Sequence, residues 1–382
     1  MLPAPKTGGV SLADVMESCL AALSGETNRL ALAAPAGLLT SALVVLVDGL
    51  GAEALAARSG HARTLTAAIG PGSVIESGFP TTTAAAIGSL TTGLTPGQHG
   101  LVGYTVLDPE RGRIVNELSG YDDELDPLTW QDQPTIFERA LARGIPPFTV
   151  GPARYKDSGF SRAVLRGGQY ISAASISDRM LKAVESLRSA GGGLAFVYVP
   201  ELDQAGHAHG WQSGEWTRAL ETTDAAIAEA QRSLRGSEGM LVTADHGMLD
   251  VPARAHVLFD ETPELVDGVR FVAGEPRCLQ LHFEEDLSPA GRERLIDTWR
   301  SSEAERSWVA TRAEAVAANW FGTVRPEIEP RIGDLLIAAR KSLAYYDTRS
   351  GSSGRSMIGQ HGSWSPAEVR VPLLRYGAFA RH

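Results

Sequence analysis

Short, uninterrupted runs of apolar residues recur along the chain and alternate with longer amphipathic segments. A continuous apolar run is typical of a strand that is buried on both faces, as in a parallel sheet. The sequence therefore predicts five buried strands, at residues 43–47, 147–150, 194–199, 240–243 and 335–338.

The segments between these runs carry apolar residues at helical spacing. Helices are predicted at 135–142, at 177–189 and at 216–234, and the last of these is the richest in helix-forming residues. Alternation of strands and helices predicts an α/β fold with a doubly wound, mostly parallel sheet flanked by helices. Ligands of such sheets bind beyond the carboxyl ends of the strands.

Residues 262–332 interrupt this alternation, with further helical patterns at 288–299 and 310–320. We interpret the whole chain, 1–382, as one catalytic domain in which 262–332 forms a small cap or insertion. The segment 104–133 is expected to be a second, loop-rich excursion.

Composition narrows the possible partners. The chain has 382 residues, of which 43% are hydrophobic, so it can bury a large core. Its formal net charge is −10 and it has no basic run, which argues against a nucleic-acid polymer as partner. A small anionic substrate stays compatible with this charge, because bound metal ions can invert the local field.

The cysteines and the lengths of the apolar runs indicate in which cellular compartment the protein is expected. Cys19 and Cys278 are far apart and form no CxxC motif, as expected of buried thiols in a reducing compartment. The N-terminal segment has no apolar run long enough for a secretory signal, and no run elsewhere reaches the length of a membrane span. The sequence therefore predicts a cytoplasmic location and leaves the oligomeric state open.

Aspartate and histidine residues follow three of the predicted strands and recur in a late loop. Each has an ordinary structural explanation by itself, such as a helix cap or a turn. Taken together they supply the nitrogen and oxygen ligands that two divalent ions require, and ions about 4 Å apart would clamp a phosphoryl group. The six residues are Asp48, Asp203, His207, Asp245, His246 and His361.

A run of three threonines, Thr81, Thr82 and Thr83, follows Pro80 and precedes an alanine-rich segment. This pattern predicts the start of a helix, where one threonine is expected to cap the backbone. A hydroxyl at that position also lies among free N–H donors, which favour a bound phosphate. Contact with a metal ion would lower the hydroxyl's pKa and make it a nucleophile.

In the content and order of these motifs, the chain resembles the alkaline phosphatase superfamily and, within it, the type I phosphodiesterase/nucleotide pyrophosphatase family. The motifs are VDG, P-x-x-T with a downstream TGLTPGQHG, DQAGHAHG, ADHGM and GQHG, and the resemblance spans about residues 42–377. It implies an alkaline-phosphatase-like fold and a hydrolase of small phosphorylated molecules, such as nucleotides or phosphodiesters. It also implies two divalent metal ions, usually zinc, with manganese or iron as alternatives.

The resemblance further assigns roles to individual residues. Thr83 matches the nucleophile, because it lies three residues after Pro80 and nine before Thr92, whereas Thr81 and Thr82 fit neither count. In the family this threonine is phosphorylated and water then hydrolyses the phosphoenzyme. One metal, which activates the nucleophile, is held by residues matching Asp48, Asp245 and His246, and the other by residues matching Asp203, His207 and His361.

The chain departs from the family's pattern after His99-Gly100, where nucleotide pyrophosphatases usually carry an asparagine a few residues on. Here the sequence continues LVGY, and the phenol of Tyr104 could donate a hydrogen bond instead. His209 is a second possible substrate contact. A phosphomonoesterase or phosphonate hydrolase would use the same metal core. A monoesterase would add a cation, for which Arg277 and Lys156 are candidates.

Three other classes fit less well. A sulfatase would need a Cys or Ser in a C/S-x-P-x-R context, which neither cysteine provides. A dinucleotide-dependent dehydrogenase is disfavoured because the loop after Asp48 has Gly49 and Gly51 but Ala54 in place of the third glycine. An inactive metal-binding homologue usually lacks a ligand or the nucleophile, whereas here all seven positions are filled.

Overall fold

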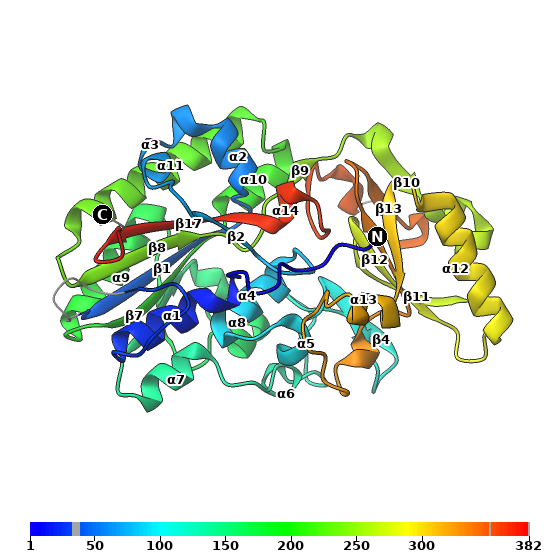
Figure 1. Ribbon diagram of the computed structural model, residues 1–382, viewed down its shortest axis with the longest axis horizontal. Helices are drawn as coiled ribbons and strands as arrows, with labels where there is room; N and C mark the ends of the chain where they lie inside the picture. Colours follow the sequence, from blue (N-terminus) through cyan, green and yellow to red (C-terminus); the bar gives the residue numbers. More distant parts are fainter. Residues whose placement is uncertain (33–38, 351–352, 381–382) are drawn as a thin grey trace.

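The larger of the two main sheets has seven strands. In the computed structural model it occupies the left half of the view, with β1, β8 and β17 labelled (Figure 1). The structure describes residues 1–32, 39–350 and 353–380. The strand order is β2-β17-β8-β1-β7-β5-β6, and every pair from β8 to β6 is parallel, whereas β17 runs antiparallel to both of its neighbours. The strands of this sheet are β1 (Ser41–Val47), β2 (Val74–Glu76), β5 (Pro147–Gly151), β6 (Gln169–Ser172), β7 (Gly193–Val199), β8 (Glu238–Thr243) and β17 (Arg370–Gly377).

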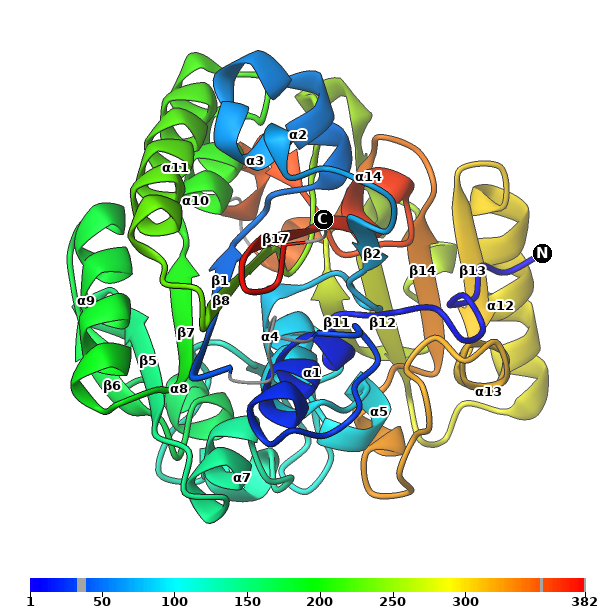
Figure 2. The ribbon, with the colours of Figure 1, turned by 60° about the vertical axis from the view of Figure 1, so that its left-hand side comes forward.

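Helices cover both faces of this sheet (Figures 1 and 2). One face carries α2 (Ala52–Ala57), α3 (Arg63–Ala67), α9 (Ile176–Ser189), α10 (Glu201–His209) and α11 (Gly214–Ser233). The other face carries α1 (Ala13–Leu23), α4 (Thr83–Thr92), α7 (Ile136–Ala142) and α8 (Gly159–Val164). This arrangement confirms the predicted α/β class with a doubly wound, mostly parallel sheet.

The predicted helices follow from local sequence signals. The α7 helix begins after Thr135, whose hydroxyl accepts a hydrogen bond from the backbone N–H of Glu138 at 3.1 Å, while the Glu138 carboxylate accepts from Thr135 N at 2.9 Å. This reciprocal capping box satisfies two N–H groups that a helix start would otherwise leave unpaired. The helices α9 and α11 likewise match their predicted positions to within two residues.

A second, six-stranded antiparallel sheet lies beside the first, with α12 on its outer side (Figure 2). Its order is β13-β14-β12-β11-β3-β4. Its strands are β3 (Thr105–Asp108), β4 (Arg113–Asn116), β11 (Val269–Glu275), β12 (Cys278–Phe283), β13 (Ser307–Thr311) and β14 (Leu335–Ala339), and its helices are α12 (Pro289–Glu303) and α13 (Arg312–Ala317).

The fifth predicted strand, 335–338, is therefore β14 of the antiparallel sheet and not a strand of the parallel one. Its apolar run has a different cause from the other four. Leu335 and Ile337 pack into the hydrophobic cluster that includes Trp299 of α12, whereas Leu336 and Ala338 pack into the main core. Both faces of β14 are buried, so the strand shows no polar alternation although its neighbours are antiparallel.

The predicted cap, 262–332, supplies β11, β12, α12, β13 and α13 to this second sheet. The segment 104–133, expected to be rich in loops, contributes the hairpin β3–β4, and β11 pairs with β3 through Gly274 and Thr105. The second sheet thus combines strands from distant parts of the chain. The single domain 1–382 and the role of 262–332 as a cap stay predictions.

The remaining short elements connect the two sheets. They are α5 (Pro96–His99), α6 (Pro127–Trp130), α14 (Pro366–Val369), β9 (Leu249–Asp250), β10 (His256–Leu258), β15 (Ala344–Tyr346) and β16 (Gly359–Gln360). Cys19 and Cys278 are both free and buried. Within the described ranges, no helix combines the length and the hydrophobicity that crossing a membrane requires.

Candidate metal centre

Neighbouring parallel strands bring most of the predicted ligands to one edge of the central sheet. Asp48 directly follows β1, Asp203 lies in the first turn of α10 after β7, and Asp245 and His246 follow β8. Because these three strands are adjacent and parallel, their carboxyl ends meet at the same edge. His207 lies one helical turn after Asp203, on the same face of α10.

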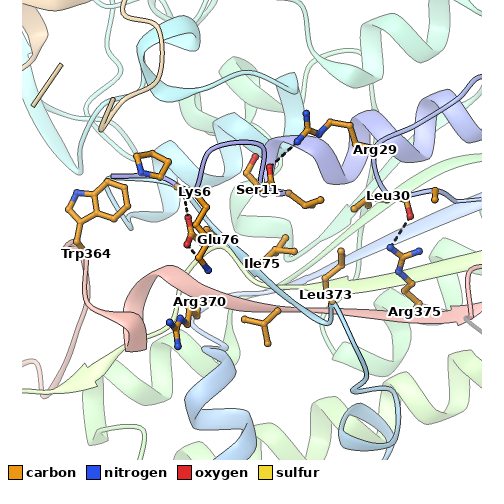
Figure 3. Close-up of a pocket in the computed structure, with 17 residues that line it drawn as sticks. Lys6, Ser11, Arg29, Leu30, Ile75, Glu76, Trp364, Arg370, Leu373 and Arg375 are labelled. Atoms are coloured by element: carbon orange, nitrogen blue, oxygen red, sulfur yellow. Dashed lines mark hydrogen bonds and ion pairs between the residues drawn. The ribbon is translucent and has the colours of Figure 1, made fainter. Parts of the chain in front are cut away.

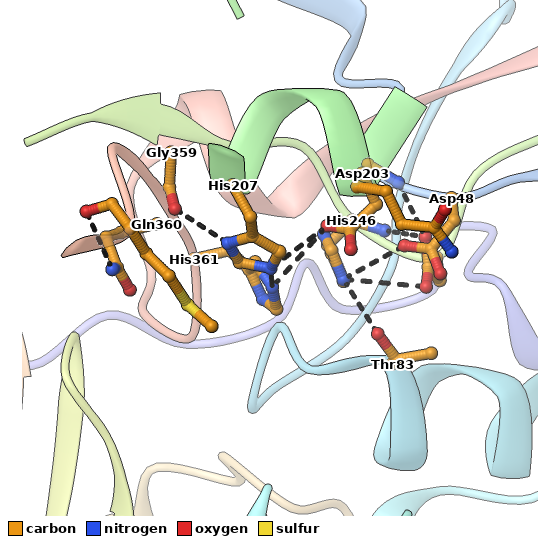
Figure 4. Close-up of polar contacts among 12 residues, drawn as sticks. Asp48, Thr83, Asp203, His207, His246, Gly359, Gln360 and His361 are labelled. Carbon is orange, nitrogen blue, oxygen red and sulfur yellow. Dashed lines mark hydrogen bonds and ion pairs between the residues drawn. The ribbon is translucent and has the colours of Figure 1, made fainter. Parts of the chain in front are cut away.

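His361 reaches the site from far along the chain. The two-stranded pair β9–β16 holds residues 359–360 against the segment that follows β8. In addition, the backbone N–H of Ile358 donates to the carbonyl oxygen of His207 at 2.8 Å. These contacts place the imidazole of His361 between those of His207 and His246, as Figure 4 shows, and it stacks on His246 with ring centroids 3.6 Å apart.

The ligand atoms form two groups, each with its atoms within 4.8 Å of one another. One group is Asp203, His207 and His361, in which Asp203 Oδ1 lies 3.3 Å from His207 Nε2 and 3.8 Å from His361 Nε2. The other is Asp48, Asp203 and His246, with Asp48 Oδ1 3.6 Å from His246 Nε2. Asp203 thus lies within reach of both groups.

Asp245 is placed beside the second group. Its Oδ2 lies 3.5 Å from His246 Nε2, while its Oδ1 accepts hydrogen bonds from the backbone N–H groups of Gly49 and His246 at 3.1 and 3.0 Å. These two bonds hold the carboxylate in one orientation and leave Oδ2 facing the cluster.

The three imidazoles are oriented alike. His207 Nδ1 lies 2.8 Å from the carbonyl oxygen of Gly359, His361 Nδ1 lies 2.7 Å from that of Thr81, and His246 Nδ1 lies 3.2 Å from that of Gly247. A carbonyl only accepts hydrogen bonds, so Nδ1 is the donor in each ring and Nε2 of the neutral ring carries a lone pair. All three lone pairs point into the cluster, which is the orientation of metal-binding histidines.

The electrostatics of the cluster fit bound cations. Asp48 Oδ1, Asp203 Oδ1 and Asp245 Oδ2 are buried and have no hydrogen-bond partner among the described residues. Burial, together with the neighbouring carboxylates, raises the pKa of Asp48 well above its usual value, and burial raises that of Asp203. Burial and the adjacent imidazoles lower the pKa of His361, which keeps this ring neutral and able to bind a metal.

Glycines allow the loops that carry these ligands to approach each other. Gly49 has φ +74°, and a Cβ there would lie 3.1 Å from the Cα and Cβ atoms of Asp203. A Cβ on Gly247 would meet the carbonyl oxygen of Ala367 at 2.1 Å and the Cα of Gly51 at 2.6 Å. The glycines of the VDG and ADHG motifs are therefore required by close backbone contacts around the cluster.

Thr83 is the first residue of α4 and points from the helix start toward His246 (Figure 4). Its Oγ1 lies 3.2 Å from His246 Nε2, and the residue is 9% exposed. Thr82 occupies the N-cap position without a side-chain cap, in contrast to the capping role expected of one threonine. The Thr81 hydroxyl donates to the carbonyl oxygen of Ser363 at 2.8 Å and so fixes the loop that carries His361.

A cavity of about 220 Å³ opens next to Thr83, Asp48 and Asp203. Its remaining walls are mainly aromatic and aliphatic. They include Leu118, Tyr155, Phe160, Leu165, Tyr170, Phe196 and Tyr198, together with Ser158, Ser161 and Gln204 at less apolar positions.

Tyr198 is a residue of this site that the sequence analysis did not identify. Its phenol donates a hydrogen bond to Asp48 Oδ2, which leaves Asp48 Oδ1 free to face the cluster. Tyr198 lies in the predicted strand 194–199 and carries the only polar side chain of that run. A polar side chain in an otherwise apolar strand was the available signal.

Replacing Tyr198 by phenylalanine is expected to weaken metal binding about 10–100-fold, because hydrogen bonds that orient a ligand contribute to affinity on that scale. Competition with a zinc chelator measures the change. Tyr155→Phe is the matched control, because among the described residues only Gln204 forms a hydrogen bond with the Tyr155 hydroxyl, at 3.4 Å. Equal metal affinities of Tyr198→Phe and the wild type would contradict the prediction.

Two of the suggested substrate contacts lie away from the cluster. Tyr104 is 40% exposed and precedes β3, and it is not among the residues that line the cavity beside Thr83. His209 is exposed at the end of α10 and belongs to neither group of ligand atoms. Nothing in the described part of the chain joins either side chain to the site, and their roles stay predictions.

Arg277, the third suggested substrate contact, is fully buried and is bonded to other parts of the protein, and its role in substrate binding stays a prediction. Its guanidinium donates two hydrogen bonds of 2.8 Å to the Glu368 carboxylate, itself fully buried. It also donates to the carbonyl oxygens of Lys341, Leu343 and Ala339. These bonds occupy the guanidinium, so Arg277 joins the segment before β12 to that of α14.

Replacing Arg277 by methionine is expected to lower the free energy of unfolding by about 3–5 kcal/mol, because it leaves the Glu368 carboxylate buried without its partner. Denaturant unfolding measures this loss. The matched control is Arg300→Met, which breaks an exposed pair with Glu314 and should cost less than about 1 kcal/mol. A change in substrate KM at unchanged stability would instead indicate contact with substrate.

A larger cavity, of about 400 Å³, lies between the N-terminal segment and strands β2 and β17 (Figure 3). Lys6 and Arg370 are among the residues lining it, but Lys6 is paired with Glu76 at 3.2 Å. None of the seven predicted site residues lines this cavity. It is therefore separate from the chemistry at the end of β1, β7 and β8.

The sequence of this chain matches the profile of a known protein family, and its structure is similar to solved structures. The sequence profile described as "Type I phosphodiesterase / nucleotide pyrophosphatase" matches residues 42–364. A search of curated protein sequences found no match to this chain.

Solved structures share the fold at low sequence identity. Murine ectonucleotide pyrophosphatase/phosphodiesterase 5 is 16% identical, with a TM-score of 0.65 and 88% of each chain covered. An inactive variant of the murine protein, with a threonine replaced by alanine and in complex with AMP, has a TM-score of 0.66 at 16% identity over 89% of this chain and 88% of that one. Phosphonoacetate hydrolase from Sinorhizobium meliloti 1021, in complex with phosphonoformate, is 20% identical, with a TM-score of 0.67 over 88% of this chain and 90% of that one.

Proposed function

The chain belongs to the type I phosphodiesterase/nucleotide pyrophosphatase family of the alkaline phosphatase superfamily, and on that basis we propose that it hydrolyses phosphate diesters of small molecules through Thr83. The observation that carries the proposal is the position of the Thr83 hydroxyl. Its oxygen lies 3.2 Å from His246 Nε2, beside two groups of Asp and His ligand atoms.

The proposed cofactors are two divalent cations. One would be held by Asp48, Asp245 and His246, and the other by Asp203, His207 and His361, with Asp203 also within reach of the first. The fit rests on three buried carboxylate oxygens without partners and on the inward-facing Nε2 atoms. Zinc is the proposed metal, with manganese or iron as alternatives, because the ligands are nitrogen and oxygen atoms. When bound, such ions neutralise phosphate charge and stabilise charge that develops on its oxygens.

The protein's own groups perform two displacements in this proposal. Thr83 Oγ1 attacks phosphorus, the P–O bond to the departing alcohol breaks, and the threonine proton leaves with that alcohol. Water then cleaves the phosphothreonine and restores the hydroxyl. Backbone N–H groups at the start of α4 favour the negative charge of the transferring group. The threonine-to-alanine variant of the murine structure is described as inactive, which is consistent with a threonine nucleophile.

The charge around the site favours a diester over a monoester. A monoesterase would use a further cation for the second negative charge of its substrate. Arg277 is committed to Glu368, and Lys156 is not among the residues that line the cavity beside Thr83. A phosphonate hydrolase on the same metal core is the alternative, as is an inactive homologue. A complete set of ligands and Thr83 supports activity.

Hydrolysis of bis(p-nitrophenyl) phosphate against p-nitrophenyl phosphate tests the proposal, with metal content assayed on the same sample. We expect preference for the diester and close to two ions per chain. Preference for the monoester would replace the proposal by a phosphatase. If a folded protein with both ions bound hydrolyses neither compound, the phosphonate alternative would be favoured.

A further inference from the structure

The cavity beside Thr83 offers little that could bind a charged or strongly polar group. Its lining residues, all in the described part of the chain, include no lysine, arginine or histidine, and the only charges are those of Asp48 and Asp203. With the two proposed metal ions bound, Asp48 and Asp203 are occupied as ligands, so an anionic substituent that lies against the rest of the wall would find no cation there. Burying a charge without a partner is strongly unfavourable.

Two tyrosine hydroxyls on the cavity wall are engaged with the protein, whereas Oγ1 of Thr149, which also lines the cavity, is buried without a hydrogen-bond partner among the described residues. Tyr198 donates to Asp48, and Tyr170 donates to the carbonyl oxygen of Pro152 at 2.8 Å. The rings of Tyr155 and Tyr198 meet edge to face, with centroids 5.7 Å apart. The guanidinium of Arg154 packs on the Tyr155 ring at 4.7 Å and does not itself line the cavity. What the walls present to an occupant is mainly aromatic and aliphatic surface.

The volume limits the size of the occupant. An apolar cavity of about 150 Å³ holds one benzene ring, and pockets that enclose drug-sized ligands begin near 300 Å³. At about 220 Å³, this cavity lies between the two. It has room for one substituted ring or a short aliphatic group, but not for a base and a ribose together.

Resting on the function proposed above, we propose that this cavity selects diesters in which one ester group is small, uncharged and apolar, such as a single aryl ring. The phosphate lies at Thr83, and the ring lies against Phe160, Phe196 and Leu165. Carboxylate-bearing substrates and complete nucleosides are excluded from this cavity by charge and by size, respectively.

Binding of simple phosphonates by the zinc-loaded full chain tests this selection without requiring turnover. Calorimetry compares three phosphonates, namely methylphosphonate, phenylphosphonate and 4-carboxyphenylphosphonate, with the phosphate monoester AMP, and each of the four carries a single organic group. Phenylphosphonate is expected to bind at least about tenfold more tightly than the methyl compound, because a buried ring contributes at least that much. The carboxyphenyl compound should lose this gain, and AMP should bind less tightly than phenylphosphonate.

Two variants test whether the cavity causes the preference for phenylphosphonate. Ser161→Leu fills it from α8 and should remove the advantage of the phenyl group while leaving methylphosphonate binding unchanged. Leu118→Arg adds a cation to the wall and should raise the affinity for 4-carboxyphenylphosphonate at least about tenfold by pairing the carboxylate. Leu128→Arg is the matched control, because Leu128 is exposed on α6 and lies outside the cavity.

Equal or tighter binding of the carboxyphenyl compound or of AMP to the wild type would overturn the selection. So would an undiminished phenyl preference in a folded Ser161→Leu protein, or no gain in Leu118→Arg. Failure of the proposed function has a different signature. In that case the phosphonate preferences hold, but bis(p-nitrophenyl) phosphate is not hydrolysed.

Discussion

Replacing Thr83 by alanine is expected to lower kcat by roughly 10⁴–10⁶-fold, the scale on which removal of a catalytic nucleophile acts. The side chain is small and nearly buried at the first position of α4, and its oxygen contacts His246 Nε2 but caps no helix. Its loss therefore removes the attacking atom without removing a hydrogen bond on which α4 depends. The variant should fold and retain close to two metal ions per chain.

Thr82→Ala is the matched control for this prediction. Thr82 has the same side chain one position earlier, is buried, and forms a hydrogen bond with Glu275. Its loss should be visible as reduced thermal stability, with kcat within about tenfold of the wild type, since its hydroxyl is not the attacking atom. Rapid quenching followed by mass spectrometry should find phosphate on the peptide that contains Thr83. Near-normal turnover by the Thr83→Ala enzyme would exclude this residue as nucleophile.

The central sheet was predictable because its strands are apolar for a local reason. All seven residues of β1 are buried between two layers of helices, and six of them, Ala42–Val47, form an unbroken apolar run. The same rule led to an incorrect assignment of β14, whose two faces pack into two different hydrophobic clusters. An apolar run reports burial on both faces, and it does not report the direction of the neighbouring strands.

The second sheet could not be predicted from local patterns. Strand β3 pairs with β4 across a short turn, but it joins β11 through a single pairing of Thr105 with Gly274, more than a hundred residues away in the chain. Nothing in the segment 104–133 indicates that pairing. The burial of Arg277 is equally hidden, because a charged residue is mostly exposed unless a partner such as Glu368 compensates it.

The candidate ligands were easier to find than the side chains around them. A carboxylate or an imidazole directly after a buried strand is unusual enough to attract attention, and the fold explains why Asp48, Asp203 and Asp245 converge. Tyr198 and the other residues that line the cavity belong to ordinary apolar patterns in the sequence. In such patterns Phe160 or Leu165 is expected to be a residue of the hydrophobic core. Their role depends on which face of an element borders the cavity, and that is a property of the packed structure.

Replacing Asp203 by alanine is expected to disturb the metal centre more than replacing His207. Asp203 Oδ1 lies within 3.3 Å of His207 Nε2 and 3.8 Å of His361 Nε2, and Asp203 also belongs to the group of Asp48 and His246. A carboxylate has two oxygens and can serve both groups, whereas an imidazole whose Nδ1 is bonded to a carbonyl serves one. After dialysis we expect fewer than one ion per chain in Asp203→Ala and about one in His207→Ala, measured by elemental analysis.

The stability of the metal-free protein separates this effect from unfolding. Asp203 is buried beside other carboxylates, with Oδ1 lacking a hydrogen-bond partner, and its burial raises its pKa. Its folded-state pKa is therefore above the unfolded value, so ionised Asp203 destabilises the metal-free fold once pH rises above the unfolded value. At neutral pH, metal-free Asp203→Ala should accordingly be at least as stable as the metal-free wild type. With metal bound, the wild type should be the more stable of the two.

If Asp203→Ala and His207→Ala retain the same number of ions, Asp203 serves a single site, as the family's pattern assigns it. The shared role inferred from the distances would then be wrong.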